Sequence, residues 1–150
     1  MLYHLIILIG LLALVPAFAC LVAEQNQRKQ RNKEMLHTAF TVYGRRTTDG
    51  REYEADLWCT DNLIGRRKRK CNLCVDFLND NAIAKVHARL WLHGGYFCIA
   101  PVAKGWFPGR ITYHNIFVNG YPVPKEGMVL YPGDLIRMGN SEFYLKNTKE

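Results

Sequence analysis

The sequence predicts an all-β sandwich preceded by one N-terminal transmembrane helix. Three observations predict this class: an uncharged apolar segment near the N-terminus, many short apolar or alternating runs after it, and turn signals between those runs. The remainder of the 150 residues is about the size of one ordinary domain. We therefore expect a transmembrane anchor at residues 1–23, a basic juxtamembrane tether at residues 24–36, and one β-sandwich domain at residues 37–150.

The apolar segment from Leu5 to Ala23 contains 19 residues without a charge. As a helix it would span about 30 Å, the thickness of a hydrocarbon core, and Pro16 is tolerated in such a helix. Three alternatives are a cleaved signal peptide, a lipoprotein signal acylated at Cys20, and a buried soluble helix. The absence of Lys or Arg before the segment disfavours a signal peptide, and the residues before Cys20 are a poor match to a lipoprotein signal. The segment is apolar on all sides, which disfavours a buried soluble helix, so we favour the anchor.

Cations follow the apolar segment on one side only, at Arg28, Lys29, Arg31 and Lys33. The positive-inside bias then predicts a single-pass protein of the cell membrane whose domain faces the cytoplasm. The net charge of +7 lies entirely after the anchor, which favours anionic partners such as acidic proteins, phosphate groups or acidic lipid.

Short runs separated by turn signals predict the strands of the sandwich. Asp49-Gly50 is a hairpin signal, and residues 86–92 alternate between apolar and polar. The connection of residues 102–114 is long enough to predict a functional loop. The candidate strands are residues 37–44, 52–59, 62–66, 72–78, 86–93, 96–102, 115–120, 128–134 and 141–146.

Cys71 and Cys74 have the spacing of metal ligands, but a second Cys-x-x-Cys pair is absent from the sequence. On a strand, residues three apart point to opposite faces and do not grip one ion. Buried thiols are the better interpretation, so we expect no metal and no other cofactor.

Catalysis is disfavoured by the residue types available. Ser141 is the single serine of the chain, and the sequence has no nucleophile elbow, paired-carboxylate site or phosphate-binding glycine loop. No catalytic residue is therefore assigned, and a binding module is favoured over an enzyme. Nucleic acid is a less favoured partner, because the cations are clumped at residues 66–70, away from Trp91, Trp106 and Phe107, and the domain is expected beside a bilayer.

Four short motifs occur in order between residues 38 and 145. They are Ile64-Gly65-Arg66, His87-Ala88, Phe117-Val118-Asn119-Gly120, and the run 130–136 followed by Gly139. Each motif alone is weak, but the ordered series resembles a forkhead-associated (FHA) domain of the membrane-anchored bacterial type. That family is a β-sandwich that binds phosphothreonine peptides.

The resemblance implies roles for particular residues. Arg66, whose planar guanidinium suits two phosphate oxygens, would contact phosphate together with Lys85. Asn115 or Asn119 would lie near the peptide backbone. His87 would brace the binding loops, with Gly65 and Gly120 allowing the turns on which the site depends.

Two departures predict a partly degenerate phosphothreonine pocket. The family pattern Ser-x-x-His is Ala84-Lys85-Val86-His87 here, and the pattern Asn-Gly-Thr is His114-Asn115-Ile116. A lost hydrogen bond to a charged group is worth roughly 1.5 to 3 kcal/mol, about tenfold to a hundredfold in affinity. Weak phosphothreonine binding and no such binding both stay open.

The sequence thus predicts a membrane-anchored cytoplasmic module that recruits a phosphothreonine-containing or acidic protein partner. By resemblance, it would act in Ser/Thr-kinase signalling linked to cell-wall synthesis or division. The alternative is a degenerate FHA scaffold that binds an unphosphorylated partner through the 102–114 loop, with Trp106 and Phe107 as the apolar contact.

Overall fold

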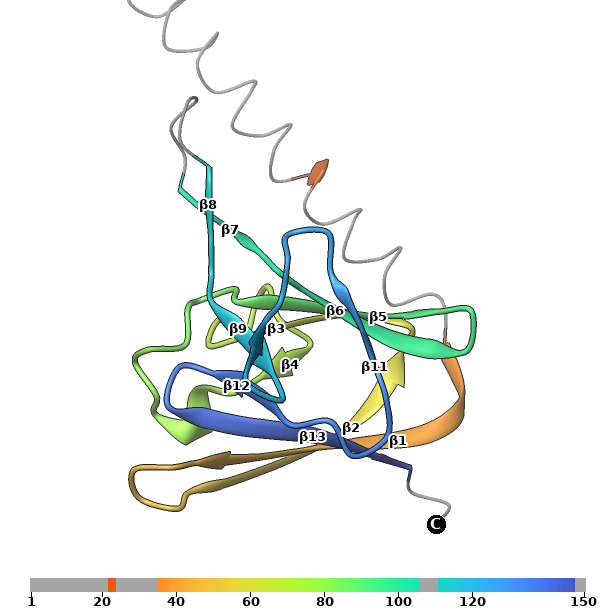
Figure 1. Cartoon of the computed structure of the whole chain (residues 1–150), viewed down its shortest axis with the longest axis horizontal. Helices are drawn as coiled ribbons and strands as arrows, with labels where there is room; N and C mark the ends of the chain where they lie inside the picture. Colours follow the sequence, from red (N-terminus) through yellow and green to blue (C-terminus); the bar gives the residue numbers. More distant parts are fainter. Residues whose placement is uncertain (1–21, 24–34, 106–110, 148–150) are drawn as a thin grey trace, which may run out of the picture.

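The computed structural model describes residues 22–23, 35–105 and 111–147. Two sheets form a sandwich, in which β5 and β6 lie above β1 and β13 (Figure 1). The strands are β1 (Met35–Arg46), β2 (Glu52–Cys59), β3 (Asp61–Gly65), β4 (Leu73–Cys74), β5 (Ala88–His93), β6 (Tyr96–Pro101), β7 (Ala103–Lys104), β8 (Thr112–Tyr113), β9 (Ile116–Val118), β10 (Tyr121–Pro122), β11 (Met128–Leu130), β12 (Ile136–Met138) and β13 (Ser141–Asn147).

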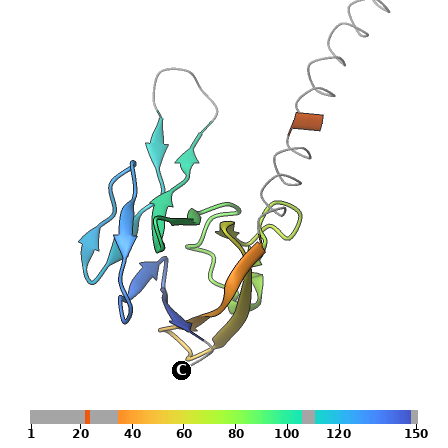
Figure 2. The same cartoon turned by 90° about the vertical axis from the view of Figure 1, so that its right-hand side faces the viewer.

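The strands pair into a six-stranded sheet of order β10-β9-β12-β13-β1-β2 and a five-stranded sheet of order β11-β6-β5-β3-β4. Neighbours are antiparallel except for the short parallel pair β3–β4. A separate two-stranded sheet, β7–β8, projects from the sandwich (Figure 2). The predicted all-β sandwich is confirmed, and the predicted 102–114 loop contains this hairpin.

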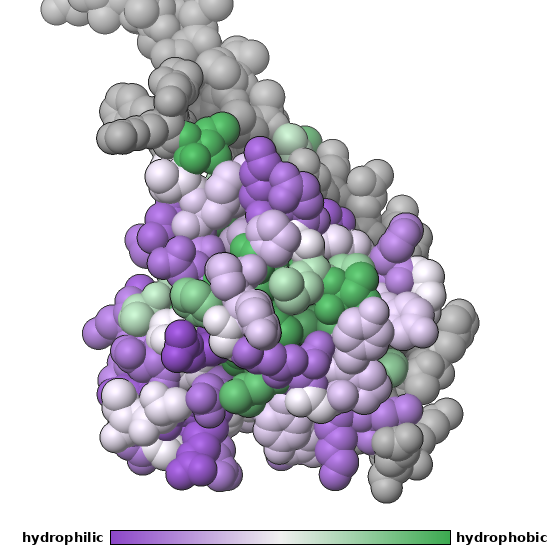
Figure 3. All heavy atoms as spheres, viewed as in Figure 1, coloured by the Kyte–Doolittle hydropathy of each residue, from purple (hydrophilic) through white to green (hydrophobic). Residues whose placement is uncertain are grey.

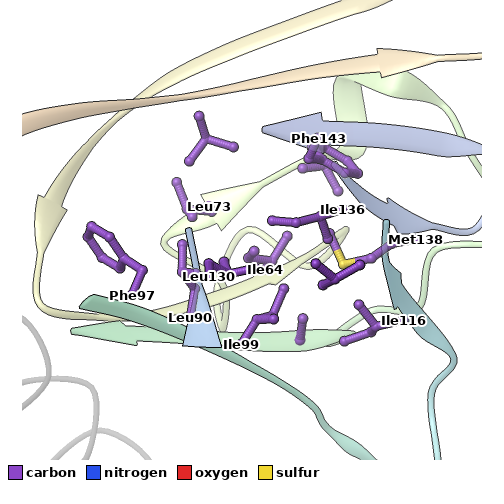
Figure 4. Packing of buried hydrophobic residues seen from close by; sticks show 14 of the residues in the cluster. Ile64, Leu73, Leu90, Phe97, Ile99, Ile116, Leu130, Ile136, Met138 and Phe143 are labelled. Atoms are coloured by element: carbon purple, nitrogen blue, oxygen red, sulfur yellow. The ribbon is translucent and has the colours of Figure 1, made fainter. Parts of the chain in front are cut away.

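The core lies between the sheets because alternate side chains of each strand point inward. Leu90 and Ile99 of the five-stranded sheet meet Met138 and Phe143 of the six-stranded sheet, and all four are buried (Figure 4). Polar or exposed residues occupy many of the intervening positions, as in the β5 sequence Ala88–His93.

Two strand predictions differ from the structure. In the expected strand 72–78 only Leu73–Cys74 is extended, and Asp76–Leu78 form a 3-10 helix that ends at Asn79 in the left-handed conformation. The expected strand 128–134 ends at Leu130, because Tyr131 and Asp134 close a turn. The chain then forms β12, which was not predicted as a strand of its own.

The predicted anchor, residues 1–23, lies outside the described residues except for Val22 and Ala23. The tether lies outside them except for Met35 and Leu36. Among the residues that the structure describes, no helix is long and apolar enough to cross a membrane.

The sandwich has two chemically different ends. The basic end comprises the turns at residues 46–51, 66–70, 79–87 and 139–141, and it carries the cation run. The aromatic end comprises the turns at residues 93–96 and 131–135, which contain no Lys or Arg. The β1–β2 turn of the basic end lies on the left in Figure 1, and the β5–β6 turn of the aromatic end lies on the right.

Candidate functional site

The site is built around the end of β3, where Gly65 allows a close approach of two backbones. A Cβ atom added to Gly65 would clash with the carbonyl group of Lys85. The amide of Arg66 donates to the carbonyl oxygen of Ala84 at 3.1 Å, and the amide of Arg67 donates to that of Lys85 at 3.0 Å. The first two residues of the cation run are therefore fixed against residues 84–85.

The guanidinium group of Arg66 is held along the same loop. Its Nε donates to the carbonyl oxygen of Ile83 at 2.6 Å, and one terminal nitrogen donates to Oδ1 of Asn81 at 3.4 Å. The side chain is half-buried, whereas Lys85 and residues 67–69 are exposed. Arg66 thus presents a positioned cation near several exposed ones, and its remaining N–H groups could donate to an anion.

The buried His87 connects the loop that contains Ala84 to the loop that contains Asn115. It is 3% exposed, its Nδ1 accepts from the amide of Ala84 at 3.0 Å, and its Nε2 lies 3.0 Å from the carbonyl oxygen of Asn115. Since Nδ1 accepts, Nε2 carries the proton and donates to Asn115. Burial lowers the pKa of His87, although the bond to Asn115 opposes this shift. His87 is thus a neutral cross-link between residues 84 and 115.

His114 stacks on His87, with ring centroids 4.8 Å apart and planes 24° from parallel. Burial, the neighbouring His87 ring and the charge of Lys104 lower the pKa of His114 to about 4. Sequence reasoning treated His114 only as a departure from the family pattern and did not single out Lys104. The structure places His114 against the cross-linking histidine, with Lys104 close enough to act on both rings.

Asp80 braces the loop that carries Ala84 and Lys85. Its buried carboxylate accepts from the Ser141 hydroxyl at 2.7 Å, the Asn140 amide at 2.8 Å and the Ala82 amide at 3.0 Å. Burial alone would raise the pKa of Asp80, but these hydrogen bonds lower it overall. Ser141, the only serine, is buried in this network, so its hydroxyl is not exposed as a nucleophile.

The β1–β2 turn is joined to the same framework. Arg46 donates to the carbonyl oxygens of Leu78 at 3.1 Å and Asn79 at 2.7 Å. The amide and the hydroxyl of Thr47 both donate to the carbonyl oxygen of Asn140. Three turns that are distant in sequence therefore form one hydrogen-bonded rim, and hydrophilic side chains cover much of this left-hand side in Figure 3.

A pocket of about 440 Å³ opens inside this rim. Its lining includes His87, Phe117, the cations Lys104 and Arg137, and the carboxylate of Glu142. The guanidinium carbon of Arg137 lies 4.8 Å from the centroid of the Phe117 ring, which is a cation–π contact. The pocket offers both signs of charge, with cations in excess by one.

The structure brings together Arg66, Lys85, His87 and Asn115, but it separates Asn119 from them. Asn119 lies at the opposite end of β9, where its side chain donates to Asp134 at 2.8 Å and accepts from the amide of Leu135 at 3.0 Å. We therefore remove Asn119 from the candidate site. Gly120, with φ +85°, supports the same distant turn rather than the site. Trp106 and Phe107 lie outside the described residues.

Neither a metal centre nor a catalytic constellation emerges from the described part of the chain. That part contains no group of three or more potential metal-ligating side chains. The thiols of Cys71 and Cys74 instead contact the carbonyl oxygens of Lys85 and Arg66, at 3.3 and 3.5 Å. What the arrangement offers chemically is a positioned arginine, nearby lysines and a braced loop, which together suit the binding of an anion.

The FHA domain family model matches residues 62–139, more than half of the chain. The chain belongs to the FHA domain family. FHA domains bind phosphothreonine-containing partners in signalling, and they are protein-interaction modules that are generally not enzymes. No curated protein matches the sequence.

Solved structures with this fold include three instructive neighbours. An FHA domain studied for its phosphothreonine-dependent interactions is 24% identical, with 73% of this chain and 96% of that chain covered and a TM-score of 0.50. The yeast Dun1 FHA domain, in complex with a doubly phosphorylated peptide derived from Rad53 SCD1, is 17% identical over 79% of each chain, with a TM-score of 0.52. The cytoplasmic domain of the T3SS sorting platform protein PscD from P. aeruginosa is 15% identical over 74% and 82%, with a TM-score of 0.53.

Proposed function

We propose that this FHA domain binds a phosphothreonine-containing segment of a partner protein at its basic end, and that residues 1–23 anchor it in the cell membrane with the domain in the cytoplasm. The observation that carries the binding proposal is the position of Arg66. Its guanidinium is held against residues 81–83, and the backbone beside it is hydrogen-bonded to Ala84 and to the exposed Lys85. A phosphate dianion between these two cations would gain charge-assisted hydrogen bonds.

The departure from the family pattern at Ala84 lowers the affinity that we expect for the phosphorylated segment. Ala84 lacks the hydroxyl that the resemblance places on phosphate, and its backbone is already engaged by Arg66 and His87. Lys104 and the exposed cations of residues 67–69 supply long-range attraction in its place. We therefore expect weak, salt-sensitive binding that favours partner segments with acidic residues around the phosphothreonine.

The pocket beside His87 supports the same preference. Lys104 and Arg137 line it, and Glu142 contributes one opposing charge. An acidic side chain of the bound segment would meet a net positive wall there. A Ser/Thr kinase would supply the phosphothreonine, and a link to cell-wall synthesis or division follows from the resemblance to membrane-anchored bacterial members.

The second candidate function is a degenerate scaffold that binds an unphosphorylated partner through residues 102–114. The absent hydroxyl at Ala84 favours it, as does the projection of the β7–β8 hairpin from the sandwich (Figure 2). The two candidates differ in whether the phosphate group and Arg66 matter for binding.

The test is a titration of the full chain in nanodiscs with matched phosphorylated and unphosphorylated threonine peptides rich in Asp and Glu. Arg66→Ala is expected to weaken binding of the phosphorylated peptide by about tenfold to a hundredfold, because a charge-assisted contact is lost. Ala84→Ser is expected to strengthen it by about tenfold. Arg45→Ala, which removes an exposed cation from β1, is the matched control and should change affinity little.

Equal affinity for both peptides in the wild type and in Arg66→Ala would reject the phosphothreonine proposal and favour the scaffold. Binding that depends on phosphate but not on Arg66 would reject the assignment of the site. An Arg45→Ala effect as large as that of Arg66→Ala would reduce the interaction to unspecific charge attraction.

A further inference from the structure

The outer face of the five-stranded sheet carries an apolar surface that is interrupted by Arg89 and His93. Leu90 and Ile99 point into the core, so by alternation Trp91 and Cys98 point outward, where they pair with each other and Cys98 also pairs with Val129. At the aromatic end of this face the rings of Tyr96 and Tyr131 meet edge to face at 5.9 Å.

Several side chains of this surface are accessible, although Cys98 is only 8% exposed. Tyr96 is 53% exposed, Tyr131 61% and Val129 39%. Trp91 is half-buried between the guanidinium group of Arg89, 5.0 Å from its ring, and the backbone of Gly127. Arg89 is itself paired with Asp61 at 2.9 Å, so the charge beside Trp91 is already balanced.

The outer face of the six-stranded sheet carries many more charges, although the exposed Trp58 and Tyr144 also lie on it. Arg137, Glu142, Arg45 and Glu52 lie side by side in register across four strands, and Lys146 and Asp56 flank Thr41 in another row. Charged rows of this kind suit water, whereas Val129, Trp91 and the two tyrosines, with the balanced Arg89–Asp61 pair beside them, suit an interfacial environment. The two faces of one domain are therefore not equivalent.

The chain enters the domain beside the apolar surface. β1 begins at Met35, which pairs with Cys59, and the neighbouring Thr60 accepts a hydrogen bond from Leu92 of β5. Residues 24–34 separate this entry point from the apolar N-terminal segment. They contain no apolar side chain, so they have nothing with which to cover the apolar surface. Eleven residues reach at most about 40 Å, which keeps the domain close to the bilayer that the segment would enter.

We propose that the outer face of the five-stranded sheet rests on the membrane surface, with Tyr96, Tyr131 and Val129 at the level of the lipid headgroups. Tyrosine and tryptophan favour this level because their rings are apolar and their tips polar. The exposed cations Arg67, Lys68 and Arg69 follow β3 of the same sheet, where they would attract acidic lipid. This inference rests on the membrane anchor of the proposed function and adds a defined orientation to it.

The proposed orientation leaves the peptide site usable. Arg66, Lys85 and His87 lie at the basic end, where the strands turn, and not on the outer face of the sheet. A cytoplasmic partner would approach along the membrane plane and meet the basic end from the side.

The test uses the full chain in nanodiscs that contain acidic lipid and a lipid brominated near its headgroup, which quenches nearby tryptophan. Of the three tryptophans, Trp91 lies on the apolar surface, Trp58 lies on the outer face of the other sheet, and Trp106 is replaced in both variants. Trp58→Phe with Trp106→Phe leaves Trp91 as the reporter. Trp91→Phe with Trp106→Phe leaves Trp58 as the matched control.

We expect bromolipid to quench Trp91 by about twofold and Trp58 hardly at all, because only one face meets the lipid. Tyr96→Ser combined with Tyr131→Ser should reduce the quenching of Trp91, whereas Tyr144→Ser on the other sheet should not. Equal quenching of both tryptophans, or no quenching of Trp91, would overturn the orientation.

Co-elution of the chain with the nanodisc tests the membrane anchor separately from the orientation of the domain. A chain that does not co-elute has no anchor, which overturns the anchor and the orientation together. A chain that co-elutes without quenching of Trp91 keeps the anchor and loses only the orientation. The peptide titration reports on the phosphothreonine proposal independently of both.

Discussion

The basic end and the aromatic end of the sandwich are stabilised in different ways. At the basic end, Asp80, Arg46 and Thr47 tie turns from distant parts of the chain together through hydrogen bonds that range from buried at Asp80 to exposed at Thr47. At the aromatic end, the turns at 93–96 and 131–135 meet through the rings of Tyr96 and Tyr131, and exposed hydrogen bonds join Asn119 to Asp134 and Leu135. Both ends have polar cross-links, but those of the basic end include the buried carboxylate of Asp80, which holds its loop more firmly.

The largest difference between the two ends should be in the stability lost when a carboxylate is replaced by an amide. Asp80→Asn is expected to lower the free energy of unfolding by about 3 kcal/mol, because an amide nitrogen would face backbone and hydroxyl donors in a buried position. Asp134→Asn at the aromatic end, where the carboxylate is half-buried, should lower it by about 1 kcal/mol. Urea unfolding of both variants at pH 7 measures the difference.

The effect of Asp80 should also depend on pH. Its pKa is lowered in the folded protein, so its stabilising contribution is present above the unfolded value of about 3.9 and is lost as the pH falls through the folded value. The difference in the free energy of unfolding between wild type and Asp80→Asn should therefore become smaller in acid. A difference that stays constant down to the acid transition would contradict the role assigned to the carboxylate charge.

Replacing one glycine at each end tests how closely the backbone is packed there. Gly65→Ala should destabilise the protein by about 2 kcal/mol and weaken peptide binding, because the new Cβ would push the end of β3 away from Lys85. Gly94→Ala should be milder, by about 1 kcal/mol, since space surrounds Gly94 and only its positive φ is unfavourable. Chemical denaturation together with the peptide titration separates the two effects, and a binding loss in Gly94→Ala would contradict the placement of the site.

The stacked histidines should add a pH dependence that leaves stability near neutral pH unchanged. The pKa of His114 is about 4 in the folded protein against about 6.5 when unfolded, so the unfolded chain binds protons first as the pH falls. Stability should therefore be lost between about pH 6.5 and pH 4. His114→Asn should flatten this part of the unfolding profile, whereas His93→Asn at the aromatic end should leave it unchanged. Identical profiles for wild type and His114→Asn would show that the stack is not responsible.

Part of the site followed from short local patterns. Gly65-Arg66 and His87 were predicted because a glycine that permits close approach, the arginine after it and a histidine at the start of an alternating strand are local features. Asn119 was misplaced for the same reason: Asn-Gly identifies a turn, but β9 runs from Ile116 at the basic end to Val118 at the other, and this direction carries Asn119 away from Arg66.

The sequence by itself determined the sandwich class, the hairpin at Asp49-Gly50, the core-facing positions of β5 and the positively charged loop. Alternation, turn residues and charge runs are properties of neighbouring residues, so they can be read along the chain. The tertiary structure alone decided that Asp80 meets Ser141, that His114 stacks on His87, and that charged rows cover the outer face of one sheet while the other carries few charges. These depend on strand order and register, which join residues dozens of positions apart through packing that no local pattern encodes.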